Sequence, residues 1–324
     1  MTENSNSTAG RRQTGVIMDP IDGIAVYKDS TFAMLLEAQR RGHDIWYMEP
    51  GDLSVRDGTA LGHMRPLEVR DNTSDWFTLG ESEQRELSFL DFLLMRKDPP
   101  FDMDYVYTTY VLDLAERDGV TVVNRPQALR DANEKCFTTQ FAQCCVPMLI
   151  TRSSTEIKAF VTEHGLSVVK PLDGMGGESI FRLEPGDPNV NVILESITAK
   201  DHELVMVQRY IPEITEGDKR IIVVAGEPVP YALERIPGEC EFRGNLGKGG
   251  TGVGVELSER DRWIVAQVAP ELVNRGILFA GLDVIGDWLT EVNVTSPTCI
   301  RELDDQFGLN IASDLFDAME ASRG

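Results

Sequence analysis

Short apolar segments alternate with longer amphipathic segments along most of this chain, and this alternation limits the folds open to it. Apolar runs such as residues 44–48 and 220–224 have the length of buried strands. Residues 31–41 instead carry apolar side chains at helical spacing, after a serine at position 30 that can cap the helix. Strands that alternate with helices are typical of α/β proteins, so the sequence predicts an α/β fold.

The same pattern places the individual elements. Strands are expected over residues 15–19, 44–48, 89–95, 121–124, 148–150, 168–169, 204–208, 220–224 and 230–233. Helices are expected over residues 31–41, 105–118, 127–143, 155–164, 258–274 and 304–321. A β-hairpin is expected over residues 279–294.

The length of 324 residues allows two or three compact units. We expect a loose polar tail over residues 1–14, a first unit over 15–126 and a second over 127–324. A glycine-dense segment at about 241–254 cannot pack a core, so we expect it to be a mobile surface loop.

The charge balance restricts the partners. Thirty-one Lys and Arg residues against 53 Asp and Glu residues give a net charge of −22, which repels nucleic acid and anionic lipid. No apolar run approaches the roughly eighteen residues of a membrane span, and the five cysteines show no disulfide or metal spacing. We therefore expect a cytoplasmic protein without nucleic acid or membrane partners, in which any anionic ligand is met by a local cluster of Arg and Lys.

One strand runs into an unusual loop. The sequence KPLDGMGG at residues 170–177 follows the short strand at 168–169, with a lysine first and three glycines among its last four residues. Glycines let backbone N–H groups turn toward a ligand, and a lysine can hold a phosphate oxygen as a point charge. The segment suits a flexible phosphate cover, although an ordinary turn has the same composition and the P-loop pattern is absent.

The hairpin at 279–294 carries the strongest independent signal. Glu291 and Asn293 are two residues apart on one strand and so share a face. A three-residue loop over 286–288 would place Asp283 opposite Glu291, whereas a two-residue loop would send Asp283 to the other face. Two carboxylates and one amide suit Mg²⁺, because they leave coordination positions open for water and phosphate oxygens. The rest of the strand is apolar, so acidic side chains that face inward would need a cation.

Six motifs together carry a resemblance. They are MDP at residues 18–20, MRKDPP at 95–100, DANEK at 131–135, KPLDGMGG at 170–177, GDKR at 217–220 and TEVNVTSPT at 290–298. In this order and spacing the chain resembles the bacterial glutathione synthetases of the ATP-grasp superfamily, from about residue 15 to its last helix. The resemblance implies an N-terminal pre-ATP-grasp α/β domain followed by two α+β halves that hold ATP between antiparallel sheets.

The resemblance also implies the activity and the nucleotide site. The implied reaction is ATP-dependent ligation of γ-glutamylcysteine to glycine through an acyl phosphate, giving glutathione, ADP and phosphate. The implied ATP-binding residues are Lys135, Lys170, Asp173, Gly174, Met175, Gly176, Gly177, Gln208, Arg209, Tyr210, Ile211 and Asp218. The two lysines would hold phosphates, residues 173–177 would cover them, the backbone of 208–211 would meet adenine, and Asp218 would lie near the ribose.

Metal, substrate and assembly expectations follow from the same resemblance. Asp283, Glu291 and Asn293 would bind Mg²⁺, with Mn²⁺ as a substitute. Arg220 would act on the transferring phosphoryl group and the developing oxyanion, because both steps gather negative charge. Substrate carboxylates would be bound by Lys28, Arg96, Arg220, Arg235, Arg243 and Asn245. The glycine-dense segment would close over the acyl phosphate as a lid, and the protein would be a homotetramer.

Two alternatives remain open from the residues. A superfamily ligase with another acceptor, such as a protein tail or D-alanine, would share the nucleotide and metal residues but differ in the arginines. A synapsin-like module would bind ATP for regulation only, although it would not need the full set of metal ligands. Phosphate release that depends on γ-glutamylcysteine and glycine would distinguish these possibilities.

Overall fold

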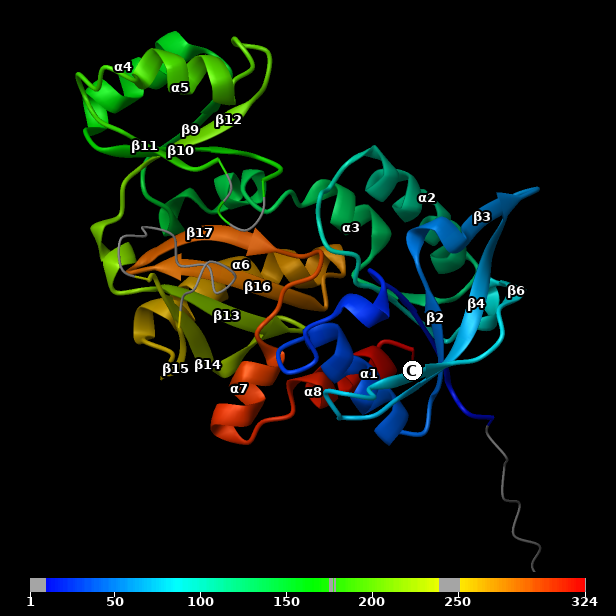
Figure 1. Ribbon diagram of the computed structural model, residues 1–324. Helices are drawn as coiled ribbons and strands as arrows, with labels where there is room; N and C mark the ends of the chain where they lie inside the picture. The colour runs from blue at the N-terminus through cyan, green and yellow to red at the C-terminus, as the bar shows by residue number, and fades with distance from the viewer. Residues whose placement is uncertain (1–9, 175–176, 178, 239–250, 324) are drawn as a thin grey trace, which may run out of the picture.

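The structure is a computed structural model that describes residues 10–174, 177, 179–238 and 251–323. Three β-sheets with helices on their faces make up the molecule (Figure 1), which confirms the mixed fold expected from the sequence. No helix within these described residues is long and apolar enough to cross a membrane.

The first sheet is built from the N-terminal part of the chain. Its strands are β1 (Gln13–Ile17), β2 (Asp44–Met48), β3 (Leu53–Arg56), β4 (Thr59–Val69), β5 (Phe77–Leu79), β6 (Glu83–Glu86), β7 (Phe92–Met95) and β8 (Thr121–Val123). Strand β1 is parallel to β2 and β7, β7 is parallel to β8, and β4 joins β2 in antiparallel fashion. The carboxyl ends of the parallel strands lie together, which places the loops that follow β1 and β7 at one edge. The helices of this part are α1 (Ser30–Arg40), α2 (Met103–Arg117) and α3 (Pro126–Asp131).

The second sheet is small and antiparallel. It has the order β11 (Phe181–Leu183), β10 (Ser167–Pro171), β12 (Val205–Arg209) and β9 (Met148–Thr151). Helices α4 (Ser154–His164) and α5 (Val190–Ile197) contribute Ile157 and Leu194 to the same core as Val169 and Val207. In Figure 1 this sheet and its two helices stand apart from the rest of the molecule. Its hydrophobic core is separate from the two larger cores of the molecule.

The third sheet is also antiparallel and lies between two layers of helices. Its order is β15 (Thr251–Glu256), β14 (Glu227–Ile236), β13 (Asp218–Val224), β16 (Phe279–Ile285) and β17 (Trp288–Asn293). The helices are α6 (Glu259–Arg275), α7 (Ile300–Phe307) and α8 (Ile311–Ala321). Ile221 belongs to the core that contains residues of α6, whereas its neighbour Ile222 belongs to the core that contains residues of α7 and α8. Burial on both faces explains the continuous apolar run at 221–224.

Short 3₁₀ segments complete the described chain. They span Ile21–Gly23, Pro50–Asp52, Leu87–Phe89, Cys136–Cys144 and Pro212–Thr215. The helix expected over residues 127–143 is therefore wrong, because this stretch forms α3 and a 3₁₀ segment separated by residues 132–135. The break places residues 134 and 135 in the connection between the two pieces.

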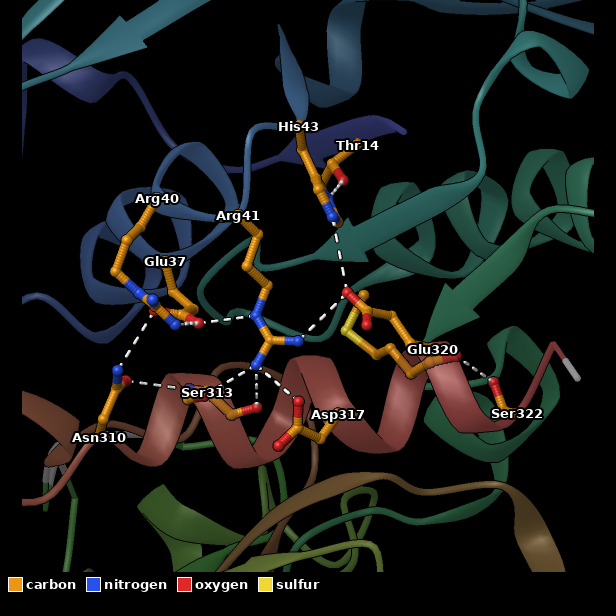
Figure 2. Close-up of polar contacts among 11 residues, drawn as sticks. Thr14, Glu37, Arg40, Arg41, His43, Asn310, Ser313, Asp317, Glu320 and Ser322 are labelled. Atoms are coloured by element: carbon orange, nitrogen blue, oxygen red, sulfur yellow. Dashed lines mark hydrogen bonds and ion pairs between the residues drawn. The ribbon is translucent and has the colours of Figure 1, made fainter. Parts of the chain in front are cut away.

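Helices α1 and α8 are joined by a cluster of polar side chains (Figure 2). Arg41, directly after α1, donates from Nε to Glu37 at 2.7 Å and from its NH2 nitrogen to Asp317 of α8 at 2.7 Å. The NH1 nitrogen of Arg41 reaches Glu320 at 3.2 Å, and the Nδ1 atom of His43 lies 2.8 Å from Thr14 Oγ1. One arginine thus connects α1 to the last helix of the chain.

Several element boundaries differ from the expected ones. Strand β1 begins at Gln13, so the end of the expected polar tail belongs to the first sheet. Asp29, not Ser30, caps α1, and its Oδ1 accepts from the Phe32 N–H at 2.6 Å. The helix expected over residues 304–321 is divided at Gly308, whose φ of +66° suits glycine and ends α7.

The glycine-dense segment is partly a strand. Residues 239–250 lie outside the described part of the chain, but Thr251–Glu256 forms β15, which pairs with β14. A Cβ atom at Gly254 would lie 2.1 Å from the Phe307 ring, so glycine lets α7 approach this strand. The expectation of a loop over residues 251–254 is therefore wrong. These residues form a strand, and Gly254 allows this strand to pack closely against Phe307 of α7.

Candidate active site

One large cavity of about 740 Å³ lies where the second and third sheets meet the loops after β1 and β7. It brings together most of the residues that the sequence singles out. These are Lys28, Lys135, Lys170, Gly174, Gly177, Gln208, Tyr210, Ile211, Asp218, Arg220, Arg235, Asp283, Glu291 and Asn293. Residues from distant parts of the chain therefore converge on one space of ligand size.

The hairpin β16–β17 brings its acidic residues to one face of the cavity. Asp283 lies opposite Glu291 as expected, but the loop is a two-residue turn, since Ile285 pairs with Trp288. The register shifts between Asp283 and Val284, which leaves Thr290 as an extra residue on β17. The bulge restores the register that a two-residue loop alone would have lost.

Asp283 is buried between two arginines. Arg220 donates from Nε and from its NH2 nitrogen, the latter at 2.9 Å, and Arg235 approaches the same carboxylate at 3.0 Å. Burial favours the protonated acid, but the two guanidinium groups outweigh it and hold the pKa of Asp283 well below its usual range. Arg220 lies on β13 beside β16, and Arg235 on β14, so the sheet itself fixes this arrangement.

Glu291 is matched by two lysines. The Nζ atoms of Lys135 and Lys170 lie 3.6 and 3.5 Å from Glu291 Oε1. Burial raises the pKa of Glu291, but these ammonium groups outweigh the effect and lower it. Lys135 also donates to the Gly174 carbonyl at 2.7 Å, which connects the break after α3 to the glycine loop that follows β10.

The cavity holds more acid than its cations neutralise. Burial and the neighbouring Glu291 raise the pKa of Glu134 to about 7. Burial also raises the pKa of Asp218 to about 7, against the opposing charge of Arg235, and the Oδ1 atom of Asp218 is buried without a hydrogen-bond partner. Crowded oxygen donors of this kind fit a divalent cation such as Mg²⁺, which takes carboxylate and amide oxygens.

The candidate ligand set is a mixed one. Within the described ranges no three His, Cys, Asp or Glu side chains converge as a metal site, and the expected set contains two carboxylates and the amide of Asn293. Asn293 Nδ2 donates to the Gly281 carbonyl at 3.3 Å. Since one hydrogen of the amide nitrogen is used within the hairpin, the amide group is oriented by this bond and its side-chain oxygen is left for a ligand.

Two backbone N–H groups of the connector after β12 make hydrogen bonds within the protein. The N–H groups of Arg209 and Tyr210 donate to the carbonyls of Pro147 and Leu166, each at 3.0 Å. These two N–H groups are therefore not available to adenine. Arg209 does not line the cavity, because its guanidinium lies 5.8 Å from the Trp288 ring centroid on an exposed surface.

Two more expected residues lie outside the cavity lining. Arg96 is buried, donates from Nε to Thr31 Oγ1 at 3.0 Å and from its NH2 nitrogen to the Pro297 carbonyl at 2.9 Å. Asp173 lines a second cavity of only about 20 Å³. Met175, Gly176, Arg243 and Asn245 lie outside the described residues. Arg96 thus holds the segment that follows β17 instead of facing the large cavity.

Some lining residues carry no prior expectation. Glu134 stands inside the DANEK motif, next to Lys135, so the motif itself contains its signal. Glu302 follows the TEVNVTSPT motif by four residues and lines the cavity from α7. No spacing rule distinguishes Glu302 from other helix-surface acids, because its position depends on how α7 packs against the start of α1.

Comparisons with known proteins agree with this architecture. The model of the prokaryotic glutathione synthetase N-terminal domain matches residues 13–130, and that of the ATP-grasp domain of the same family matches residues 134–308. Glutathione synthetase of Xanthomonas axonopodis pv. citri is 60% identical over 306 residues, covering 94% of this chain and 97% of that protein. Glutathione synthetase of Pseudomonas aeruginosa is 57% identical over 307 residues, covering 95% and 97%.

Solved structures share the fold at low identity. The crystal structure of D-cycloserine synthetase DcsG has a TM-score of 0.64 at 13% identity and covers 95% of this chain and 99% of that one. D-alanyl-alanine synthetase A from Vibrio cholerae has a TM-score of 0.60 at 13% identity and covers 97% and 98%. The chain therefore belongs to the prokaryotic glutathione synthetase family of ATP-dependent ATP-grasp ligases.

Proposed function

We propose that this protein joins γ-glutamylcysteine to glycine with ATP, forming glutathione, ADP and phosphate. One observation carries the proposal beyond family membership. The carboxylates of Asp283 and Glu291 and the cations of Arg220, Arg235, Lys135 and Lys170 meet in a single cavity. Phosphoryl transfer depends on this combination, because it is catalysed by positioning and charge rather than by a nucleophilic side chain.

The nucleotide would bind between the second and third sheets. Lys135 and Lys170 would hold phosphate oxygens, and residues 173–177 would cover them. Gln208, Tyr210 and Ile211 line the cavity and would lie at its adenine end. Since the N–H groups at 209 and 210 are used within the sheet, adenine would be met by other groups of this connector. Asp218 would contact the nucleotide through its unpartnered Oδ1.

Asp283, Glu291 and Asn293 would hold Mg²⁺, or Mn²⁺ in its place. The bound metal ion would neutralise charge on the phosphate groups. If the Asp283 carboxylate bound a cation, Arg220 and Arg235 would lose it as a shared partner. Arg220 would then be free to face the transferring phosphoryl group and the developing oxyanion.

The reaction proceeds in two steps. A carboxylate oxygen of the cysteine residue attacks the γ-phosphorus of ATP, ADP leaves, and an acyl phosphate is formed. The glycine amine then attacks the acyl carbon, phosphate leaves, and the nitrogen loses a proton as the amide forms. Arg220 lies beside Asp283 on neighbouring strands, a position that suits both the phosphoryl group and the carbonyl oxygen.

Substrate carboxylates would be bound by Lys28 and Arg235, which line the cavity, together with Arg243 and Asn245. Arg96 would support this site through the Pro297 carbonyl. Of the segment expected as a lid at about 241–254, residues 251–254 belong to β15, so the lid would be formed by the residues before that strand. The lid would exclude water from the acyl phosphate.

We also propose the organisation of the whole protein. A substrate-binding domain over residues 15–126 would precede an ATP-grasp domain over residues 127–324. The protein would act in the cytoplasm as a homotetramer, with small molecules as its substrates.

Phosphate release tests the proposed function. With ATP and Mg²⁺ the protein is expected to release phosphate only when γ-glutamylcysteine and glycine are both present, and glutathione should appear in equal amount. Release that depends on D-alanine or on a protein tail instead would assign another acceptor. ATP binding without release for any acceptor would assign a regulatory module.

A further inference from the structure

Glu302 is an acid in the substrate cavity that has an unused oxygen. The residue lies in the first turn of α7 and lines the cavity, and its Oε2 atom is buried without a hydrogen-bond partner. The preceding Arg301 does not neutralise it by an ion pair, because its NH2 nitrogen binds Asp71 at 2.9 Å. A buried carboxylate oxygen without a donor is unfavourable, so this position favours a ligand that supplies one.

A hydrogen bond between distant segments brings the start of α7, which carries Glu302, to the start of α1, which follows Lys28. The Ile300 N–H donates to Ser30 Oγ at 3.1 Å, which fixes the start of α7 against the start of α1. Lys28 lies just before α1, lines the same cavity and has no ion pair with any residue that the structure describes. Burial raises the pKa of Glu302, and the charge of Lys28 is among the effects that oppose this rise. An acid and a base thus face the same space without forming a pair.

Other carboxylates at this end of the cavity already have donors. Asp29 accepts from the Phe32 N–H at 2.6 Å, and Asp98 accepts from Ser296 Oγ at 2.6 Å. Asp19 lies 2.9 Å from the Lys97 ammonium group. Of the described carboxylates here, Glu302 is therefore the one with a buried oxygen still to be satisfied.

A γ-glutamyl residue has a matching distribution of charge. Because it is linked through its side chain, it keeps both a free α-ammonium and a free α-carboxylate on one carbon. We propose that Glu302 binds this α-ammonium group while Lys28 binds the α-carboxylate beside it. This inference rests on the proposed function and adds the residue that distinguishes a γ-linked amino acid from a simple dicarboxylic acid.

The test compares two acceptors in the Glu302→Gln variant. N-Glutaryl-cysteine has the carbon skeleton of γ-glutamylcysteine but lacks the α-amino group. For γ-glutamylcysteine we expect kcat/KM to fall roughly 10- to 100-fold, the effect of losing one hydrogen bond between charged groups. For glutaryl-cysteine, and for the KM of glycine and of ATP, the change should stay within about twofold, because the acid has no ammonium partner there.

Asp305→Asn provides a matched control on an exposed position of the same helix, and should leave both acceptors unaffected. Thermal unfolding of each variant checks that α7 remains folded. An equal loss with both acceptors would overturn the proposal, as would a higher KM for glycine in place of γ-glutamylcysteine. Failure of the unaltered protein to ligate γ-glutamylcysteine would instead overturn the proposed function.

Discussion

Asp283 and Glu291 lie opposite each other on the β16–β17 hairpin, yet different cations neutralise them. Asp283 is held by arginines of the third sheet, whereas Glu291 is held by lysines that reach it from outside that sheet. Lys170 belongs to the small second sheet, so its contact with Glu291 crosses between two units. Glu291 therefore connects parts of the molecule that surround the large cavity, whereas Asp283 is neutralised within its own sheet.

Replacing Asp283 with Asn should abolish metal-dependent nucleotide binding. The change removes a ligand oxygen charge and leaves Arg220 and Arg235 without their shared carboxylate. We expect at least a roughly 100-fold loss in kcat, by analogy with other electrostatic groups in active sites. The increase in melting temperature caused by Mg²⁺ with ATP should also disappear, and thermal unfolding with and without Mg²⁺ measures it.

Asp287→Asn is the control for this change, because Asp287 lies exposed in the turn of the same hairpin. It should retain both activity and the Mg²⁺-dependent increase in melting temperature. A normal Mg²⁺ response in the Asp283→Asn variant would contradict the assignment of Asp283 as a ligand.

Arg96→Met should lower kcat and the free energy of unfolding and should change the KM for γ-glutamylcysteine only slightly. Arg96 does not line the cavity, and its hydrogen bonds hold Thr31 and the Pro297 carbonyl. Leaving these buried acceptors without a donor should cost about 1–3 kcal/mol in the free energy of unfolding. Steady-state kinetics and urea unfolding separate the two roles, since direct binding of a substrate carboxylate would mainly raise the KM for γ-glutamylcysteine.

Gly254→Ala should destabilise the contact between β15 and α7. The added Cβ would lie 2.1 Å from Phe307, which stacks on Tyr231 with 3.7 Å between the ring centroids. We expect a loss of about 1–3 kcal/mol, typical of overpacking, measured by urea unfolding. Combining it with Phe307→Leu should recover part of this loss, and a double variant that is merely additive would show that the ring is not the obstacle.

Glu37→Gln should reduce stability at neutral pH but much less in acid. Burial raises the pKa of Glu37, but hydrogen bonds from Arg40, Arg41 and Asn310 outweigh it and lower the pKa to about 2 from an ordinary 4.5. A depressed carboxyl pKa contributes stability above pH 4.5, and this contribution is lost as the pH falls through 2. The expected cost at pH 7 is about 2–3 kcal/mol, from urea unfolding.

The difference between Glu37→Gln and the unaltered protein should therefore shrink from pH 7 to pH 3. Asp317→Asn serves as a control in the same cluster (Figure 2), because Asp317 is 68% exposed and its ion pair with Arg41 is screened by water. Its cost should stay below about 1 kcal/mol. A pH-independent effect of Glu37→Gln would indicate lost packing instead of lost charge.

Glu134→Gln should change the pH dependence of the ligand-free protein in the opposite sense. The pKa of Glu134 is raised to about 7, first by burial and then by Glu291, so folding favours its protonated form. The buried carboxyl must ionise as the pH rises from about 4.5 through 7, and this ionisation lowers the free energy of unfolding of the protein. Melting temperatures at pH 5 and pH 8 should differ less in the variant, and an unchanged difference would refute the assignment.

The register of the hairpin was predictable, but the reason for it was not. Alternation along β17 correctly places Glu291 and Asn293 on one face. The turn has two residues instead of three, and the bulge at Thr290 compensates. The Thr290 hydroxyl donates to the Asp283 carbonyl at 3.1 Å, a local contact that no periodicity reveals.

Other elements were missed for identifiable physical reasons. Strand β4 alternates buried and exposed side chains, but its Pro66 and His63 obscure the pattern. The position of the Arg96 side chain was also not predictable. Its guanidinium is buried and binds a backbone oxygen and a hydroxyl oxygen, but the sequence motif around it would be the same if it faced a ligand. Sequence identifies residue types for the chemistry, whereas tertiary packing decides which of them reach the cavity.

The polar junction between α1 and α8 has a consequence for biosynthesis. Arg41 and Asp317 are 276 positions apart, so α1 leaves the ribosome long before its partner exists. At about 5–20 residues per second the delay is on the order of tens of seconds. During that interval Arg41 keeps its contact with Glu37 but lacks its contacts with Ser313, Asp317 and Glu320. In a chain that ends before α8, the face of α1 that normally contacts α8 would remain exposed to solvent. Chaperones and proteases could then bind it.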